Sequence, residues 1–184
     1  SAPMCAMQTG KYPRFAARLL AEFCCLTGKR KCFARLAGQR GFSETPQFEG
    51  SSCLSRERYD YMFQKRLLDE HYRTYGGSYG WVLAGLCASR KLMRKENLAK
   101  IKTPVLLFAA GHDHMVDNDA IERFAELTNR TELFFMPDSR HEIFNADERT
   151  RTKYYDEIFR FIKEEEVKDY ENENEQTRKI LGTV

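Results

Sequence analysis

The sequence has no apolar run that approaches the roughly 20 residues a membrane-spanning helix needs. Its first residues also lack the basic-then-apolar layout of a signal peptide. The net charge of +3 is too small to indicate a nucleic-acid-binding protein. These absences argue against a membrane-spanning or nucleic-acid-binding protein, and they give secretion no support.

Cysteine motifs are lacking as well. None of the six cysteines forms a CxxC pair, and no two are followed by a His or Cys pair at zinc spacing. The neighbours Cys24 and Cys25 are poorly placed for a mutual disulfide. We therefore expect reduced thiols in a cytoplasmic protein, with no metal and no cofactor.

The 184 residues have the composition of one globular domain, with 42% hydrophobic and 31% charged residues. Charge is distributed unevenly. Segment 11–41, which we expect to be helical, carries eight basic residues and a single acid, Glu22. From residue 151 onward acids outnumber bases, and residues 166–184 are predicted to form an acidic, solvated tail.

Residues 10–98 are predicted to be mostly helical. A helix in this part carries a stripe of apolar residues at helical spacing, namely Phe15, Leu19, Leu20 and Phe23. Segment 38–53 is rich in Gly, Ser and Pro and reads as a loop. A second helix is expected to begin after Ser55, a suitable N-cap, and a third, buried helix to span 81–93.

A different pattern begins near residue 101. The continuous apolar run 105–110 is typical of a strand inside a parallel sheet, and 131–137 is a second strand that proline stops. A helix opens at Asn118 between the two strands, and another is expected over 147–162. Strand, helix, strand, helix is the βαβ pattern, which predicts an α/β fold with a parallel sheet.

Polar residues follow both strands closely. Asp113 lies about three residues past the first strand, and His141 about four past the second. Functional groups gather at the carboxyl ends of strands in open α/β sheets, and neighbouring strands would bring these two loops together. An Asp that orients a His is the acid and base of a Ser-His-Asp triad, and Asp before His is the α/β-hydrolase order.

Three alternatives remain at this point. Ser78 fits a G-x-S-x-G pattern, but the polar residues before it make a poor central strand, so a cap turn is favoured. Asp117 rivals Asp113 as the triad acid. His112 and His114, with the two aspartates, also resemble a set of metal ligands, although successive loop residues point to opposite sides. Glu142 is expected to be structural.

Five segments then resemble one known family. The chain is similar to the carboxyl-terminal half of the monoacylglycerol lipase and lysophospholipase branch of the α/β-hydrolases, which is serine aminopeptidase S33-like. The resemblance extends over residues 1 to about 165. It rests on 1–4 (SAPM), 54–60 (LSRERYD), 76–82 (GGSYGWV), 104–118 (PVLLFAAGHDHMVDN) and 139–142 (SRHE).

The resemblance implies how the chain is divided. In that family the nucleophile elbow, the oxyanion loop and the central strands precede the SAPM segment, so this chain would supply only the triad acid, the triad base and a helical cap. The cap would carry the substrate-binding residues Tyr59, Tyr79 and Trp81. The implied parts are the end of a central strand at 1–9, the cap at 10–98, the βαβα core at 99–165 and the acidic tail at 166–184.

The implied function is a serine-dependent hydrolase of lysophospholipid or monoacylglycerol esters, in peripheral contact with the inner face of a membrane. The upstream half of the protein, or a second chain, would complete the sheet. Without it we expect an exposed apolar patch at Val105, Leu107, Leu133 and Phe135. The alternatives are a non-catalytic fragment that binds a lipid or partner chain, and a proline-type peptidase of the same fold.

Overall fold

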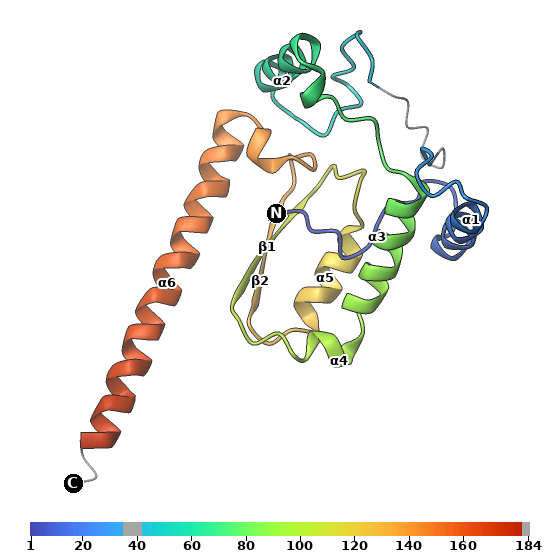
Figure 1. Cartoon of the computed structure of the whole chain (residues 1–184). Coiled ribbons are helices and arrows are strands. Elements are labelled where there is room, and N and C mark those ends of the chain that lie inside the picture. The colour runs from blue at the N-terminus through green and yellow to red at the C-terminus, as the bar shows by residue number, and fades with distance from the viewer. Residues whose placement is uncertain (35–41, 182–184) are drawn as a thin grey trace.

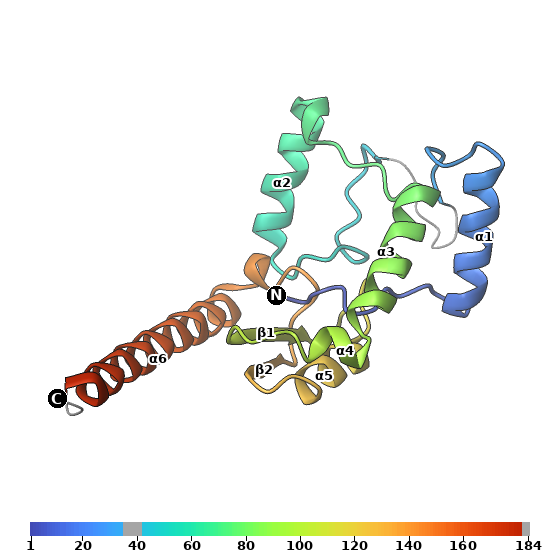
Figure 2. The ribbon, with the colours of Figure 1, turned by 60° about the horizontal axis from the view of Figure 1, so that its bottom comes forward.

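The computed structural model describes residues 1–34 and 42–181, with side chains as far as residue 171. The elements in chain order are α1 (Arg14–Leu26), α2 (Arg56–Leu68), η2 (Glu70–Tyr72), α3 (Tyr79–Leu92), α4 (Lys95–Leu98), β1 (Val105–Ala110), α5 (Asn118–Glu126), β2 (Thr131–Met136), η3 (Ile143–Asn145) and α6 (Glu148–Leu181). Two parallel strands carry helices on both faces, α2 stands beyond one end of the strands, and α1 lies beside α3 (Figures 1 and 2).

The two predicted strands are confirmed, and they pair in parallel as the βαβ pattern requires. Val105 lies opposite Thr131 and Ala110 opposite Met136, with α5 as the crossover. The free edge of β1 meets the N-terminal segment, where the Ala2 N–H donates to the Phe108 carbonyl at 2.8 Å. Helix α2 begins after Ser55, whose side chain accepts from the Arg58 N–H, as the sequence predicts.

Each face of the strand pair is covered by the chain's own helices. On one face Leu107 packs with Leu98 of α4 and Ile121 of α5, and on the other Phe108 packs with Tyr154 of α6. The predicted exposed patch is therefore wrong in part. Leu107 is only 7% exposed, and Val105 and Leu133 are half-buried beneath the same cluster, whereas Phe135 is 50% exposed.

Helix α1 forms as predicted, but its large apolar stripe points outward. The small side chains of Ala17 and Ala21 pack against Val82 and Leu86 of α3. Small residues let two helix backbones approach closely, so the large residues of α1 are left on the outer face. They are Phe15 (70% exposed), Leu19 (60%), Phe23 (63%) and Leu26 (87%).

Within residues 11–34, the part of the basic segment that the structure describes, α1 is the only helix, which corrects the expectation of further basic helix after residue 26. Residues 27–34 form turns and an isolated bridge between Phe33 and Ser78, and residues 35–41 lie outside the described part. Segment 42–53 is irregular, as the loop prediction requires. Gly28, just past the end of α1, has a positive φ of 78°, a conformation that favours glycine.

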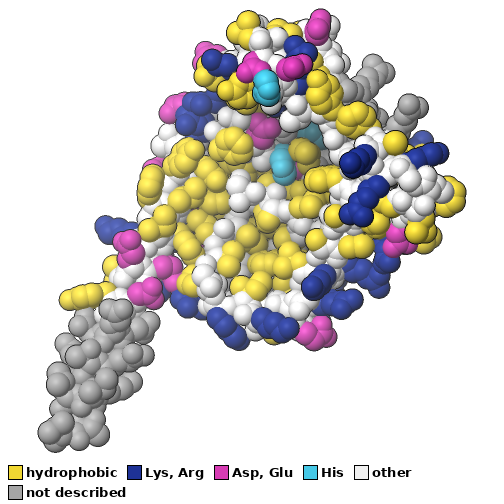
Figure 3. All heavy atoms as spheres, in the orientation of Figure 1, with side chains coloured by type: hydrophobic (Ala, Val, Ile, Leu, Met, Phe, Trp, Pro, Cys, Tyr) yellow, Lys and Arg dark blue, Asp and Glu magenta, His cyan; other side chains and the backbone are white. Residues whose placement is uncertain are grey.

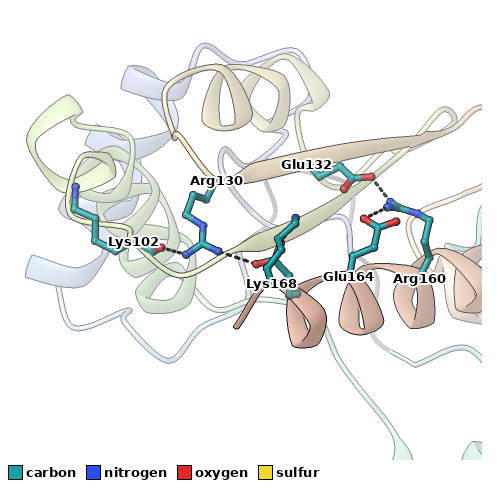
Figure 4. Close-up of polar contacts among 7 residues, drawn as sticks. Lys102, Arg130, Glu132, Arg160, Glu164 and Lys168 are labelled. Atoms are coloured by element: carbon teal, nitrogen blue, oxygen red, sulfur yellow. Dashed lines mark hydrogen bonds and ion pairs between the residues drawn. The ribbon is translucent and has the colours of Figure 1, made fainter. Parts of the chain in front are cut away.

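Helix α6 is much longer than predicted. It was expected to end near Ile162, but it continues to Leu181 and projects away from the body of the molecule (Figures 1 and 2). Two ion pairs hold its middle to the body of the molecule: Arg160 pairs with Glu132 of β2, and Glu165 pairs with Arg130, just before β2 (Figure 4). Along the helix Arg160 also pairs with Glu164 at 2.9 Å, and such pairs between residues four apart stabilise a helix on its exposed side.

Within residues 1–34 and 42–181, no helix combines the length and the apolar character that a bilayer crossing demands.

Candidate active site

The loop after β1 crosses the loop after β2 at Gly111, and the two loops are hydrogen-bonded there. The Gly111 N–H donates to the Met136 carbonyl, and the His112 N–H donates to the Ser139 carbonyl, both at 2.9 Å. A Cβ on Gly111 would lie 2.1 Å from the Pro137 carbonyl oxygen, so no larger residue fits without moving the backbone. The crossing brings the two loops that follow the strands side by side.

The crossing places Asp113 and His141 within hydrogen-bond distance. Nδ1 of His141 lies 2.8 Å from Oδ2 of Asp113. The Asp113 side chain is fully buried, whereas the His141 side chain is 25% exposed. The second carboxylate oxygen of Asp113 accepts from the N–H groups of Met115 at 2.8 Å and Val116 at 3.0 Å.

These hydrogen bonds set the direction in which the pKa of Asp113 is shifted. Burial by itself raises the pKa of Asp113, but the hydrogen bond from His141 and those from the Val116 and Met115 amides outweigh it, so the pKa is lowered. Asp113 is therefore ionised at neutral pH and accepts the proton of Nδ1. In a neutral imidazole this leaves Nε2 unprotonated and able to act as a base.

His141 opens onto a cavity of about 730 Å³. One wall comes from segment 47–53, and another from α2 through Arg58, Tyr59 and Met62. His114 and Phe144 also line it. The volume is within the range of small-molecule sites, and the lining combines polar and apolar side chains.

Two residues beside His141 fasten segment 48–53 over the site. Nη1 of Arg140 donates to the carbonyls of Phe48 (3.0 Å), Ser51 and Cys53 (both 3.2 Å). Glu142 accepts from the Ser52 hydroxyl, and its own N–H donates to the Ser52 carbonyl at 3.0 Å. The sequence interpretation gave Glu142 a structural role but missed Arg140, whose only signal was its position next to His141.

The three aromatic residues expected to bind substrate lie in different places. Tyr59 lines the cavity, stacks on Phe63 and accepts the Gln47 N–H at its hydroxyl at 2.6 Å. Tyr79 instead packs with the cluster between α1 and α3, and Trp81 is 52% exposed beside Gly77. Neither of these two lines the cavity; both lie in the first turn of α3.

Asp117, the rival acid, has other partners. It forms an ion pair with Arg14, and its carboxylate caps α5 by accepting from the Asp119 N–H at 3.2 Å. Ser78 is the N-cap of α3 and accepts from the Trp81 N–H at 3.2 Å, as expected of a cap turn. No three His, Cys, Asp or Glu side chains converge on a possible metal position in the part of the chain that the structure describes.

The two parallel strands, their crossover and the flanking helices belong to the α/β-hydrolase fold, of which the chain forms a part. The chain belongs to the family described as serine aminopeptidase, S33, whose model matches residues 1–148. The resemblance noted in the sequence is thereby confirmed at the level of the family.

Two solved structures share the fold at low sequence identity. A soluble variant of the monoglyceride lipase of Saccharomyces cerevisiae, in complex with a substrate analogue, has 18% identity and a TM-score of 0.58, over 82% of this chain and 48% of that one. The monoacylglycerol lipase of Paleococcus ferrophilus has 20% identity and a TM-score of 0.53, over 88% of this chain and 56% of that one. The chain thus spans about half the length of these lipases. It matches no curated protein.

Proposed function

We propose that this chain supplies the acid and the base of a serine hydrolase that cleaves single-chain lipid esters, either monoacylglycerols or lysophospholipids. The observation that carries the proposal is the buried Asp113–His141 pair, whose histidine opens onto a cavity of about 730 Å³. Similarity to two monoglyceride lipases supports the substrate class.

In this mechanism a serine from polypeptide outside residues 1–184 attacks the ester carbonyl carbon. Nε2 of His141 takes the serine proton and then delivers it to the leaving alcohol as the C–O bond breaks, which leaves an acyl-enzyme. Water then attacks the acyl-enzyme by the same proton route, releasing the fatty acid. Asp113 holds Nδ1–H and stabilises the imidazolium that forms at each step.

The same proposal assigns a cap to residues 10–98 and a partner polypeptide to the sheet. The free edge of β1 beyond the contact with Ala2 supports the partner. So do the hydrophobic side chains that gather along the free edge of β1, between α6 and α3 (Figure 3). An unpaired, apolar sheet edge is a position where further strands add.

The outward apolar stripe of α1 supports peripheral contact with a membrane.

The test uses the native protein that contains these residues. A fluorophosphonate probe should label one serine, and the protein should release fatty acid from 1-monooleoylglycerol or lysophosphatidylcholine. The Asp113→Asn variant should lower turnover by about 10⁴-fold with unchanged folding, whereas Asp117→Asn should retain most of it. Full activity of Asp113→Asn would overturn the assignment, and activity on proline peptides alone would replace the lipid with a peptide substrate.

A further inference from the structure

A second cavity, of about 570 Å³, lies between α1, α3 and α5. It shares no lining residue with the cavity at His141. Its apolar walls include Met7, Leu86 and Met93, and Phe15 of α1 stands at its edge with 70% of its surface exposed. We call it the α1–α3–α5 groove.

Basic side chains line this groove in excess of acidic ones. Arg14 and Arg18 have acidic partners, Asp117 and Glu22. The guanidinium groups of Arg90 on α3 and Arg123 on α5 line the groove without a hydrogen bond or ion pair to any residue that the structure describes. The lining contains two acids, Asp117 and Asp119. The carboxylate of Asp119, at the start of α5, has no partner among the residues that the structure describes.

An apolar groove with two unpaired guanidinium groups fits one class of molecule. A simple inorganic anion would gain nothing from the apolar walls, and a neutral lipid would leave both guanidinium groups without a counter-charge. Guanidinium groups pair well with carboxylates, and the volume is within the usual range of about 300–1,000 Å³ for small ligands.

We propose that the α1–α3–α5 groove binds a single-chain carboxylate, a fatty acid, with its alkyl chain along Met7, Leu86 and Met93 and its carboxylate at Arg90 and Arg123. The site is separate from the proposed catalytic pair, because its cavity shares no lining residue with the cavity at His141. Its test is a binding measurement that does not depend on hydrolysis.

The experiment is calorimetric titration of the native protein with laurate. Two other ligands are titrated for comparison: acetate has the carboxylate without the alkyl chain, and dodecyltrimethylammonium has the chain with a cationic head group. Laurate should bind, whereas acetate and the cation should bind at least a hundredfold more weakly. Arg90→Gln combined with Arg123→Gln should weaken laurate binding at least tenfold. The matched control, Arg94→Gln with Arg149→Gln, removes the same charge from exposed arginines outside the groove and should leave the affinity unchanged.

A third pair of substitutions identifies which cavity laurate occupies. Arg58→Gln with Arg66→Gln alters the two arginines that line the His141 cavity. If this pair abolishes laurate binding while the Arg90 and Arg123 pair has no effect, the fatty acid occupies the His141 cavity and the proposal is overturned. Equal binding of the cation would overturn it too. Circular dichroism of each variant shows that the fold is retained, and the single Arg90→Gln and Arg123→Gln variants replace the pair if it is not.

Discussion

The loops around His141 and the helix α1 place their side chains in opposite ways. In the loops, polar groups turn inward and find partners: Asp113 accepts three hydrogen bonds, and Arg140 donates to three carbonyls. On α1, alanines turn inward, and the large apolar side chains of Phe15, Phe23 and Leu26 face outward.

The difference predicts how each region tolerates change. A buried polar group that loses its partner remains desolvated, so each contact in the loops depends on its neighbours. An exposed apolar side chain has few contacts to lose, so its removal should alter what the protein binds more than how stably it folds. Substitutions in the two regions should therefore separate stability from association.

The largest effect on stability is expected at the crossing of the two loops. In the native protein, Gly111→Ala should lower the free energy of unfolding by about 3 kcal/mol, because the new methyl group would collide with the backbone of Pro137. Denaturant titration measures the change. The control is Gly50→Ala, in a loop where a Cβ meets no atom within 4 Å, and a similar loss there would contradict the role of the crossing.

A smaller effect is expected from loosening segment 48–53. Arg140→Gln removes a guanidinium that binds three carbonyls and lies 5.4 Å from the centre of the Phe48 ring, so unfolding should become easier by about 2 kcal/mol. Hydrogen exchange should also quicken in residues 48–53. Arg149→Gln, at an exposed arginine of α6, provides the comparison; if the two variants exchange alike, Arg140 does not hold the segment.

The sequence predicted the features that local patterns determine. A run of apolar residues is enough to indicate β1, and the serine N-cap at Ser55 is enough to start α2. The approach of the Asp113 and His141 loops followed from the topology, because parallel neighbouring strands end at one edge. These inferences needed no knowledge of which side chain meets which.

Features that depend on packing were not predictable in this way. An apolar stripe on a helix predicts a buried face, but α1 packs against α3 through its small residues Ala17 and Ala21 instead. Tyr79 was expected near the substrate, and only the path of the turn before α3 places it in another cluster. Arg140 finds its carbonyl partners about 90 residues away in the chain, a separation that no local pattern encodes.

The smallest effect on stability, and the largest on association, is expected on α1. Replacing Phe15, Leu19 and Phe23 by serine should change the free energy of unfolding by no more than about 0.5 kcal/mol for each residue, since all three are at least 60% exposed. Binding to vesicles of phosphatidylcholine and phosphatidylglycerol should fall at least tenfold, because the stripe and the nearby Arg14 and Arg18 suit an anionic interface. Sedimentation with vesicles measures it.

The matched control is the same change at three exposed apolar residues of α6, namely Phe159, Val167 and Tyr170. Their neighbours include Glu164, Glu165 and Glu166, so an anionic surface should repel this stretch and vesicle binding should not change. If both triple variants lose binding equally, exposure alone explains the association and the basic flank of α1 has no part in it. If only the α1 variant unfolds more easily, by several kcal/mol, then its outer face is covered by polypeptide in the native protein, and the stripe is an internal contact.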